Sequence, residues 1–236
     1  MIPEAAERLD RELADDAVVL DIGSWGRPYR RADWVIDQMP YETRGLYGFD
    51  GDGPERFNAE RWIVRDVCAK EPLPFADNFF DFVICSQTLE DLRDPIWVCE
   101  EVRRVGKAGY IELPSRLEEQ TWGIHGRWVG WSHHHWLADV SDDHIDFVFK
   151  HHIIHARPRA RFPLGFHETL SAAERVQQLW WTDTFTVRER ALMTPEETDD
   201  YFESFVAREM AARGMSQPPP PSWLRRKASR ALRRVR

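Results

Sequence analysis

The chain has 236 residues, 42% of them hydrophobic and 31% charged, and a net charge of −8. This length and composition predict one globular domain with embellishments and exclude a largely disordered protein. The charged first sixteen residues exclude a signal peptide, and no apolar stretch is long enough to cross a bilayer, so we expect a cytoplasmic protein without a transmembrane segment.

Basic residues are concentrated at the C-terminal end. From Ser222 onward there are seven basic residues and no acidic ones, and removing these seven charges from −8 leaves −15 for the rest of the chain. An acidic body argues against binding to a phosphate backbone, so no nucleic-acid partner is predicted. The three cysteines have no metal-like spacing and are interpreted as reduced core residues.

The first elements in chain order are a helix over residues 3–15, a strand over 17–20, a turn containing Asp21, Gly23 and Ser24, and a second strand over 34–36 that ends in Asp37. In an open α/β sheet, ligands bind at the carboxyl ends of the strands, where Asp37 could accept hydrogen bonds from ribose hydroxyls. The turn lacks GxGxxG spacing, and ten residues separate Gly26 from Asp37, which disfavours a dinucleotide.

Further strands are predicted over residues 61–66, ending in Asp66, and over 80–85, an apolar run typical of a strand buried on both faces. A helix follows over 95–105, with Pro95 suited to its first turn, and then a strand over 108–114. Three strands are therefore followed by or end in an aspartate.

The segments LDIGSWG, RDVCAKEPLPFADNFFDFVICSQTLEDLRDP and AGYIELPS, together with Asp37, resemble in order the motifs of class I S-adenosylmethionine-dependent methyltransferases of type 11. The resemblance covers about residues 15–115 and departs from the family at GSWG, at the short first crossover, and at Gln87 and Asp91, where many members have histidine. The short crossover is also similar to that of a subgroup associated with bacterial glycan synthesis. The chain further resembles actinobacterial enzymes that methylate the 1-hydroxyl of methylated mannosides.

The resemblance implies S-adenosylmethionine as cofactor and assigns it seven residues. Gly23 and Ser24, with Asp21 in the same turn, would border the methionine moiety. Asp37 would hold the ribose, Asp66 and Val67 would meet the adenine, and Ser86 would line the floor near the sulfur.

All nine histidines lie between His125 and His167, with four tryptophans around the start of this window. Alternation of apolar and polar residues predicts a β-hairpin, about 134–140 and 144–150 with a turn at SDD. Aromatic rings beside polar groups are a common means of binding a sugar, so an acceptor site is expected in an insert at about 116–168.

Methyl transfer to a hydroxyl requires removal of its proton, and imidazole suits that role near neutral pH. His144, His134 and Glu90 are therefore the candidate catalytic residues; an exposed strand face is the alternative explanation of the histidines. A divalent cation such as Mg²⁺ is a second possibility, since His133 or His135 with His144, Asp142 or Glu90 could form a mixed N/O site. The sequence leaves the metal ligands unknown.

The C-terminal third is expected to contain a helix over 171–179, an extended piece over 182–192, and a helix over 195–213 with Thr194 as N-cap and Glu197 completing a capping box. The apolar face of that last helix would serve the core or a homodimer contact. Residues 216–236 are predicted to be a proline linker and a basic tail, which could dock on anionic lipid or an acidic partner or be solvated.

Together these features predict a Rossmann-like α/β fold: an open, mostly parallel sheet with helices on both faces, a β-hairpin insert and C-terminal helices, in one domain over 1–215. The predicted function is S-adenosylmethionine-dependent O-methylation of a sugar or short oligosaccharide in polysaccharide biosynthesis. The alternatives are a non-catalytic cofactor-fold scaffold and a methyltransferase of another small acceptor.

Overall fold

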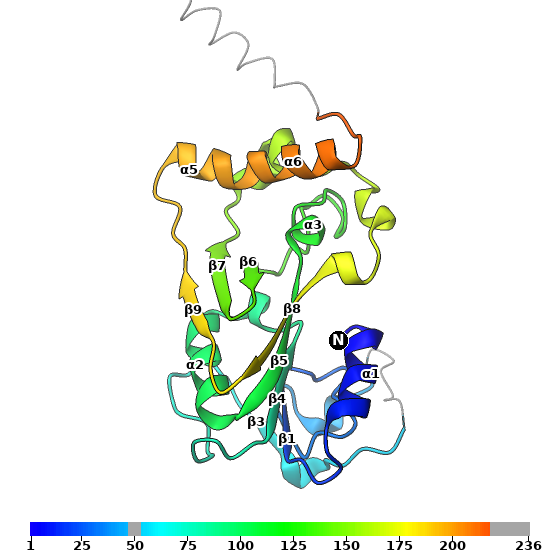
Figure 1. Cartoon of the computed structure of the whole chain (residues 1–236), viewed down its shortest axis with the longest axis vertical. Coiled ribbons are helices and arrows are strands. Elements are labelled where there is room, and N and C mark those ends of the chain that lie inside the picture. Colours follow the sequence, from blue (N-terminus) through cyan, green and yellow to red (C-terminus); the bar gives the residue numbers. More distant parts are fainter. Residues whose placement is uncertain (47–52, 218–236) are drawn as a thin grey trace, which may run out of the picture.

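The structure is a computed structural model, and it describes residues 1–46 and 53–217. A twisted sheet with a helix on each side forms one end of the molecule, and a smaller sheet covered by a helical layer forms the other (Figure 1). The predicted linker and basic tail lie almost entirely beyond residue 217, outside the described residues.

The main sheet has six strands in the order β3-β2-β1-β4-β5-β8, all parallel except β8, which is antiparallel to β5. Its strands are β1 Val19–Ile22, β2 Trp34–Asp37, β3 Trp62–Val64, β4 Phe82–Ser86, β5 Ala108–Pro114 and β8 Val176–Thr182. Because β1 pairs with both β2 and β4, the strand order reverses at β1, and ligands bind at such a switch point in open α/β sheets. The predicted Rossmann-like fold is confirmed.

Alternating side chains of the sheet pack on opposite faces, as the two-residue period of a strand requires. Leu20 of β1 and Val83 of β4 contact the core that includes α2, whereas Val19 and Ile84 contact the core that includes α1. Both faces are therefore buried, which explains why the strand sequences are almost continuously apolar.

The helices are α1 Pro3–Glu12, α2 Pro95–Val105, α3 Arg116–Glu119, α4 Ile153–Ala156, α5 Pro195–Asp199 and α6 Phe205–Ala212. α1 and α2 lie on opposite faces of the main sheet (Figure 1). Proline at the first turn of α1 and of α2 suits their start, because that N–H has no partner within the helix. No α-helix lies between β1 and β3 in the described residues, so the predicted loss of the first crossover helix is confirmed. Within the described part of the chain, no helix has both the length and the apolar character needed to cross a membrane.

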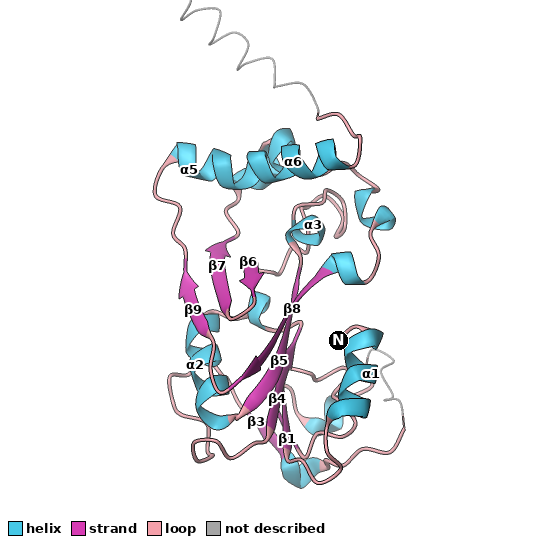
Figure 2. Cartoon of the chain, viewed as in Figure 1, coloured by secondary structure: helices cyan, strands magenta, loops and turns pink. Residues whose placement is uncertain are grey.

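The hairpin of the insert and the later strand β9 form a three-stranded sheet in the order β6-β7-β9 (Figure 2). Its strands are β6 Trp136–Ser141, β7 His144–Phe149 and β9 Thr186–Glu189. β6 and β7 pair antiparallel with Ser141 opposite His144, which confirms the predicted hairpin. The capping box between Thr194 and Glu197 is present as expected, and the C-terminal helical segment contains a π-helical turn over Asp200–Ser204.

The helix predicted over 171–179 is wrong. The chain forms a 3-10 turn at Ala173–Arg175 and then enters β8, whose seven residues all pair with β5. The segment VQQLWWT is rich in residues that favour strands, and the free edge of β5 provides backbone partners that local spacing cannot reveal.

Candidate functional site

The carboxyl ends of β1, β2 and β4 surround a cavity with about 540 Å³ of empty space, part of it open to solvent. Its lining includes Gly23, Asp37, Asp66, Val67, Gln87 and Thr88. Four of the seven predicted cofactor residues therefore meet at one place, although they come from three separate strand ends.

The glycine turn after β1 owes its form to a close contact with Thr88. Gly23 has a φ of +77°, and a Cβ atom there would lie 2.2 Å from the Thr88 Cγ2 atom. The Thr88 hydroxyl donates a hydrogen bond to the Gly23 carbonyl at 3.2 Å. Only glycine combines this backbone conformation with this approach, so the turn presents bare backbone to the cavity.

Asp21 lies behind the turn and supports it. Its buried carboxylate accepts hydrogen bonds from the Ser24 hydroxyl at 2.5 Å and from the Tyr29 N–H at 2.7 Å. Burial raises the pKa of Asp21 to about 6. Asp21 and Ser24 do not line the cavity themselves, and their hydrogen bonds hold the turn that does.

Asp37 ends β2 and does line the cavity. One carboxylate oxygen accepts from the Trp25 N–H at 3.0 Å and the other from the Met39 N–H at 2.8 Å. Burial raises the pKa of this group. Since a carboxylate offers about four acceptor positions, Asp37 retains capacity for hydroxyl groups such as those of a ribose.

Asp66 follows β3 and is half-exposed at the cavity mouth. It accepts from Arg93 at 2.7 Å and from the Cys68 N–H at 2.9 Å. The hydrogen bond from Arg93 lowers the pKa of Asp66, which keeps the carboxylate ionised. Val67 lines the cavity beside it, where a planar apolar group such as a purine could pack.

Ser86 ends β4, and its hydroxyl donates to Glu112 at 2.9 Å. The cavity lining at this point consists of the next two residues, Gln87 and Thr88. Gln87 has a φ of +54°, a conformation that a non-glycine residue seldom adopts, and its side-chain amide donates to Glu112 at 3.2 Å. The departure from the family at Gln87 was visible in the sequence, but its place in the cavity was not.

A second cavity adjoins the first and shares Gln87 and Asp91 with it. Its other lining residues are Glu90, Pro114, Glu118, Trp131, His133, His134, Arg175 and Val176. They come from the 3-10 turn Leu89–Asp91, the end of β5, α3, the start of β8 and the residues before β6. The predicted insert thus contributes one wall of a cavity that lies beside the strand ends.

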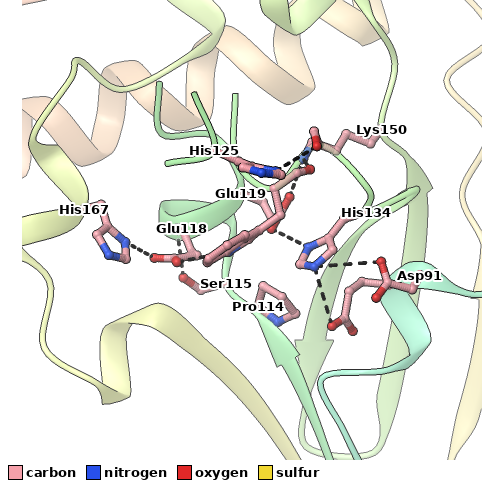
Figure 3. Close-up of polar contacts among 12 residues, drawn as sticks. Asp91, Pro114, Ser115, Glu118, Glu119, His125, His134, Lys150 and His167 are labelled. Atoms are coloured by element: carbon pink, nitrogen blue, oxygen red, sulfur yellow. Dashed lines mark hydrogen bonds and ion pairs between the residues drawn. The ribbon is translucent and has the colours of Figure 1, made fainter. Parts of the chain in front are cut away.

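His134 is held in a fixed orientation in this wall (Figure 3). Its Nδ1 lies 2.7 Å from a Glu119 carboxylate oxygen, and Glu119 also forms a buried ion pair with Lys150. Burial opposes ionisation of Glu119, but the hydrogen bond from His134 and the charge of Lys150 together lower its pKa. The Glu119 carboxylate therefore accepts the proton on Nδ1 and leaves Nε2 facing Glu90 and Asp91. Figure 3 shows the His134 ring between Glu119 and Asp91.

Glu90 and Asp91 face this nitrogen without reaching hydrogen-bond distance. The Nε2 atom of His134 lies 4.0 Å from a Glu90 oxygen and 3.9 Å from an Asp91 oxygen. Glu90 is 2% exposed, and its Oε2 atom has no hydrogen-bond partner in the described part of the chain. Burial raises the pKa of Glu90 well above its ordinary value.

The third candidate catalytic residue, His144, lies elsewhere. It begins β7, where its Nδ1 contacts the Thr186 hydroxyl and its Nε2 contacts Asp146, each at 2.6 Å. Both ring nitrogens are engaged within the insert sheet, and His144 lines neither cavity. Of the residues expected from the sequence as metal ligands, His133 and Glu90 both line the second cavity, whereas His144 lies outside it.

Comparison with known proteins gives a family match over part of the chain. Residues 49–111 match the sequence profile of a methyltransferase domain family. No curated protein matches the chain.

Similar solved structures include YcgJ from Bacillus subtilis, with 20% identity, 48% of this chain and 51% of that chain covered, and a TM-score of 0.34. An S-adenosylmethionine-dependent methyltransferase from Aquifex aeolicus shows 18% identity, 48% and 72% coverage, and a TM-score of 0.26. A chain of the complex between the Trm112 methyltransferase activator and its methyltransferase from Haloferax volcanii shows 20% identity, 46% and 50% coverage, and a TM-score of 0.34. The chain spans about half the length of several of these proteins. The profile match, taken with the strand order and the strand-end cavity, supports a class I S-adenosylmethionine-dependent methyltransferase.

Proposed function

We propose that this protein transfers a methyl group from S-adenosylmethionine to a hydroxyl of a sugar or short oligosaccharide, which binds in the second cavity. The observation that carries the proposal is the sharing of Gln87 and Asp91 by the two cavities. Methyl transfer requires donor and acceptor to meet in line across a short distance, and adjoining cavities satisfy that requirement. The 1-hydroxyl of a methylated mannoside is the narrower acceptor that the sequence resemblance suggests.

The residues of the first cavity fit the cofactor. Bare backbone at Gly23 gives close access beside β1, Asp37 retains acceptor positions for ribose hydroxyls, and Asp66 with Val67 borders a place for the adenine. When bound, S-adenosylmethionine supplies a methyl group on a positively charged sulfur. Asp21, Ser24 and Ser86 support this site from behind in the proposal, by fixing the glycine turn and the end of β4.

The second cavity fits a polyhydroxylated acceptor. The Trp131 indole donates to Glu118 at 3.3 Å and offers an apolar ring in a cavity whose lining also includes carboxylates, imidazoles and Arg175. Sugars combine apolar C–H faces with hydroxyl groups, and this mixture of aromatic and hydrogen-bonding side chains matches both. A divalent cation would be an additional means of orienting such hydroxyls.

Activation of the acceptor hydroxyl depends on His134 in this proposal. Of the histidines predicted as a general base, His134 has a free Nε2 in the cavity and a second nitrogen fixed by Glu119, the arrangement that an oriented base requires. Glu90 is the acid beside it. Two further expectations from the sequence, a cytoplasmic location and a homodimer, stay predictions.

Calorimetry with S-adenosylhomocysteine tests the first cavity. The unaltered protein should bind this ligand, and Asp37→Asn should bind it about 10- to 100-fold more weakly, because one hydrogen bond to a charged group is worth about 1.5–3 kcal/mol. Circular dichroism checks that the variant is folded. Absence of binding at millimolar ligand would contradict an S-adenosylmethionine-dependent enzyme.

A screen of methylated and unmethylated sugars with methyl-labelled cofactor tests the second cavity. His134→Ala should lower the turnover rate by about 10²- to 10⁴-fold while cofactor affinity is unchanged, as expected for loss of an activating group. His135→Ala, the exposed neighbour in the same run, is the matched control and should retain full turnover. Turnover with non-carbohydrate acceptors alone would favour a small-molecule methyltransferase, and cofactor binding without any turnover would favour a scaffold.

A further inference from the structure

We propose that Asp91, His133 and His134 form a binding site for a divalent transition-metal ion in the wall of the second cavity. One ligand atom from each of these residues lies within 4.8 Å of the others. The site itself stands on the side-chain arrangement alone; its use in binding the acceptor hydroxyl rests on the function proposed above.

The distance between His134 and Asp91 fits two ligands of one ion. Two atoms that each lie about 2.0–2.2 Å from a zinc ion can be at most about 4.4 Å apart. The His134 Nε2 atom lies 3.9 Å from the Asp91 oxygen, which is too long for a hydrogen bond and within this limit. The His133 and His134 rings stand edge to face, with centroids 4.6 Å apart.

His134 has the surroundings of a metal-binding histidine. A histidine ligand almost always donates its second ring N–H to a carboxylate, carbonyl or water, which fixes the ring and directs the free nitrogen at the ion. Glu119 provides that carboxylate at 2.7 Å, and Lys150 in turn fixes Glu119 (Figure 3). The free Nε2 faces Asp91, as a ligand nitrogen should.

Glu90 gives an independent indication that a ligand belongs here. Its carboxyl group is 98% buried, Oε2 has no hydrogen-bond partner in the described part of the chain, and Oε1 lies 4.0 Å from the His134 Nε2 atom. Buried carboxyl oxygens are normally satisfied, so Oε2 needs a polar partner that the described residues do not supply. Glu90 lines the same cavity as His133, His134 and Asp91.

The donor set indicates the class of metal. Two imidazole nitrogens and one carboxylate suit Zn²⁺, Co²⁺, Mn²⁺ or Fe²⁺, whereas Mg²⁺ prefers oxygen ligands alone. Three protein ligands leave a coordination position open, and the cavity gives a hydroxyl access to it. A metal at this point would bind the acceptor hydroxyl and lower its pKa. His134 would then be a metal ligand in place of the base proposed above, and the hydroxyl proton would pass to a water molecule in the open cavity.

Metal binding by the full-length protein without a polyhistidine tag tests the inference. The protein is treated with a chelator, dialysed, and titrated with Co²⁺ by visible absorption and with Zn²⁺ by calorimetry. We expect one equivalent of metal, and a ligand-field spectrum for Co²⁺ that reports nitrogen and oxygen donors. The assay uses neither cofactor nor acceptor, so its outcome is separate from that of the methyl-transfer screen.

His133→Ala and Asp91→Asn should each abolish stoichiometric binding; both residues are exposed, so the fold should tolerate these changes. Glu119→Gln should weaken binding by about 10- to 100-fold, the effect typical of a residue that orients a ligand. His135→Ala should bind like the unaltered protein. Less than one equivalent of metal, or binding that survives His133→Ala and is lost in His135→Ala, would overturn the proposal.

Discussion

Gly23 and Thr88 illustrate how single residues shape the site. Gly23 combines a positive φ with an approach to Thr88 that leaves no room for a Cβ atom. Gly165 has a similar φ of +82°, but nothing lies within 4 Å of the position its Cβ would occupy. Substitutions at these two glycines therefore distinguish the cost of backbone strain from the cost of a steric clash.

We predict that Gly165→Ala lowers the free energy of unfolding by about 1–2 kcal/mol through strain alone. Gly23→Ala should cost a further 1–3 kcal/mol, roughly the penalty for overpacking, and should also weaken binding of S-adenosylhomocysteine. Urea unfolding and calorimetry measure the two effects. Equal losses of stability in the two variants would show that the clash with Thr88 does not contribute to the free energy of unfolding.

Other residues of the site are held by partners far away in sequence. Asp37 accepts a hydrogen bond from the Trp25 N–H in the turn after β1. Glu119 of α3 is hydrogen-bonded to His134 and forms an ion pair with Lys150, both in the insert. Sequence motifs identify Asp37 from its position at a strand end. Nothing in the local sequence around Glu119 indicates that it orients a histidine.

At the scale of elements, the ion pair between Glu119 and Lys150 joins α3 to the end of β7. Lys150 directly follows β7, its side chain is 4% exposed, and its ammonium also donates to the Trp131 carbonyl at 2.7 Å. The pair thus positions the wall that carries His134. Because both charges are buried, each depends on the other for compensation.

Lys150→Met should lower the free energy of unfolding by about 3–5 kcal/mol, since it leaves the Glu119 charge buried with only His134 as partner. The double variant Glu119→Gln with Lys150→Met should recover much of this loss, and a double-mutant cycle measures the coupling. Arg188→Met provides the matched control. Arg188 is 67% exposed in its ion pair with Asp146, so its replacement should cost less than about 1 kcal/mol. Similar losses for Lys150→Met and Arg188→Met would exclude a structural role for the buried pair.

At the scale of the whole molecule, the two sheets share one core. Ile145 and Phe147 of the insert belong to the same buried cluster as Leu20 of β1 and Leu179 of β8. The opposite side of the hairpin packs through Leu137 and Val148 on residues of the C-terminal helical layer. The insert is therefore expected to unfold together with the main sheet.

Phe147→Ala should lower the free energy of unfolding by about 3–5 kcal/mol, because Phe147 is completely buried. Tryptophan fluorescence and far-UV circular dichroism should report coincident transitions, both displaced to lower denaturant. Phe149→Ala, in the same strand at a position 47% exposed, is the control and should change stability by less than about 1 kcal/mol. A fluorescence transition that precedes the circular-dichroism transition would indicate an insert that unfolds independently.

The fold was predictable to the extent that it depends on local patterns. Apolar runs ending in acids predicted β2 and β3, because a strand buried on both faces is almost continuously apolar. Period-two alternation predicted the hairpin of β6 and β7, because successive side chains of a strand point to opposite faces. The strand β8 was predicted as a helix, since its pairing depends on the free edge of β5 and not on its own spacing. The expectation of one domain over 1–215 and the assigned roles of the site residues stay predictions.

The sequence by itself determined that the turn after β1, Asp37 and Asp66 lie together, because the carboxyl ends of parallel strands meet at one edge of a sheet. Their role in cofactor binding, which the family resemblance implies, stays a prediction. Only the tertiary structure decided among the histidines: it engages both ring nitrogens of His144 within the sheet of β6, β7 and β9 and brings His134 beside Glu90 and Asp91. The physical reason is that these residues belong to separate elements whose packing fixes their distances, and a spacing along the chain contains no information on such contacts.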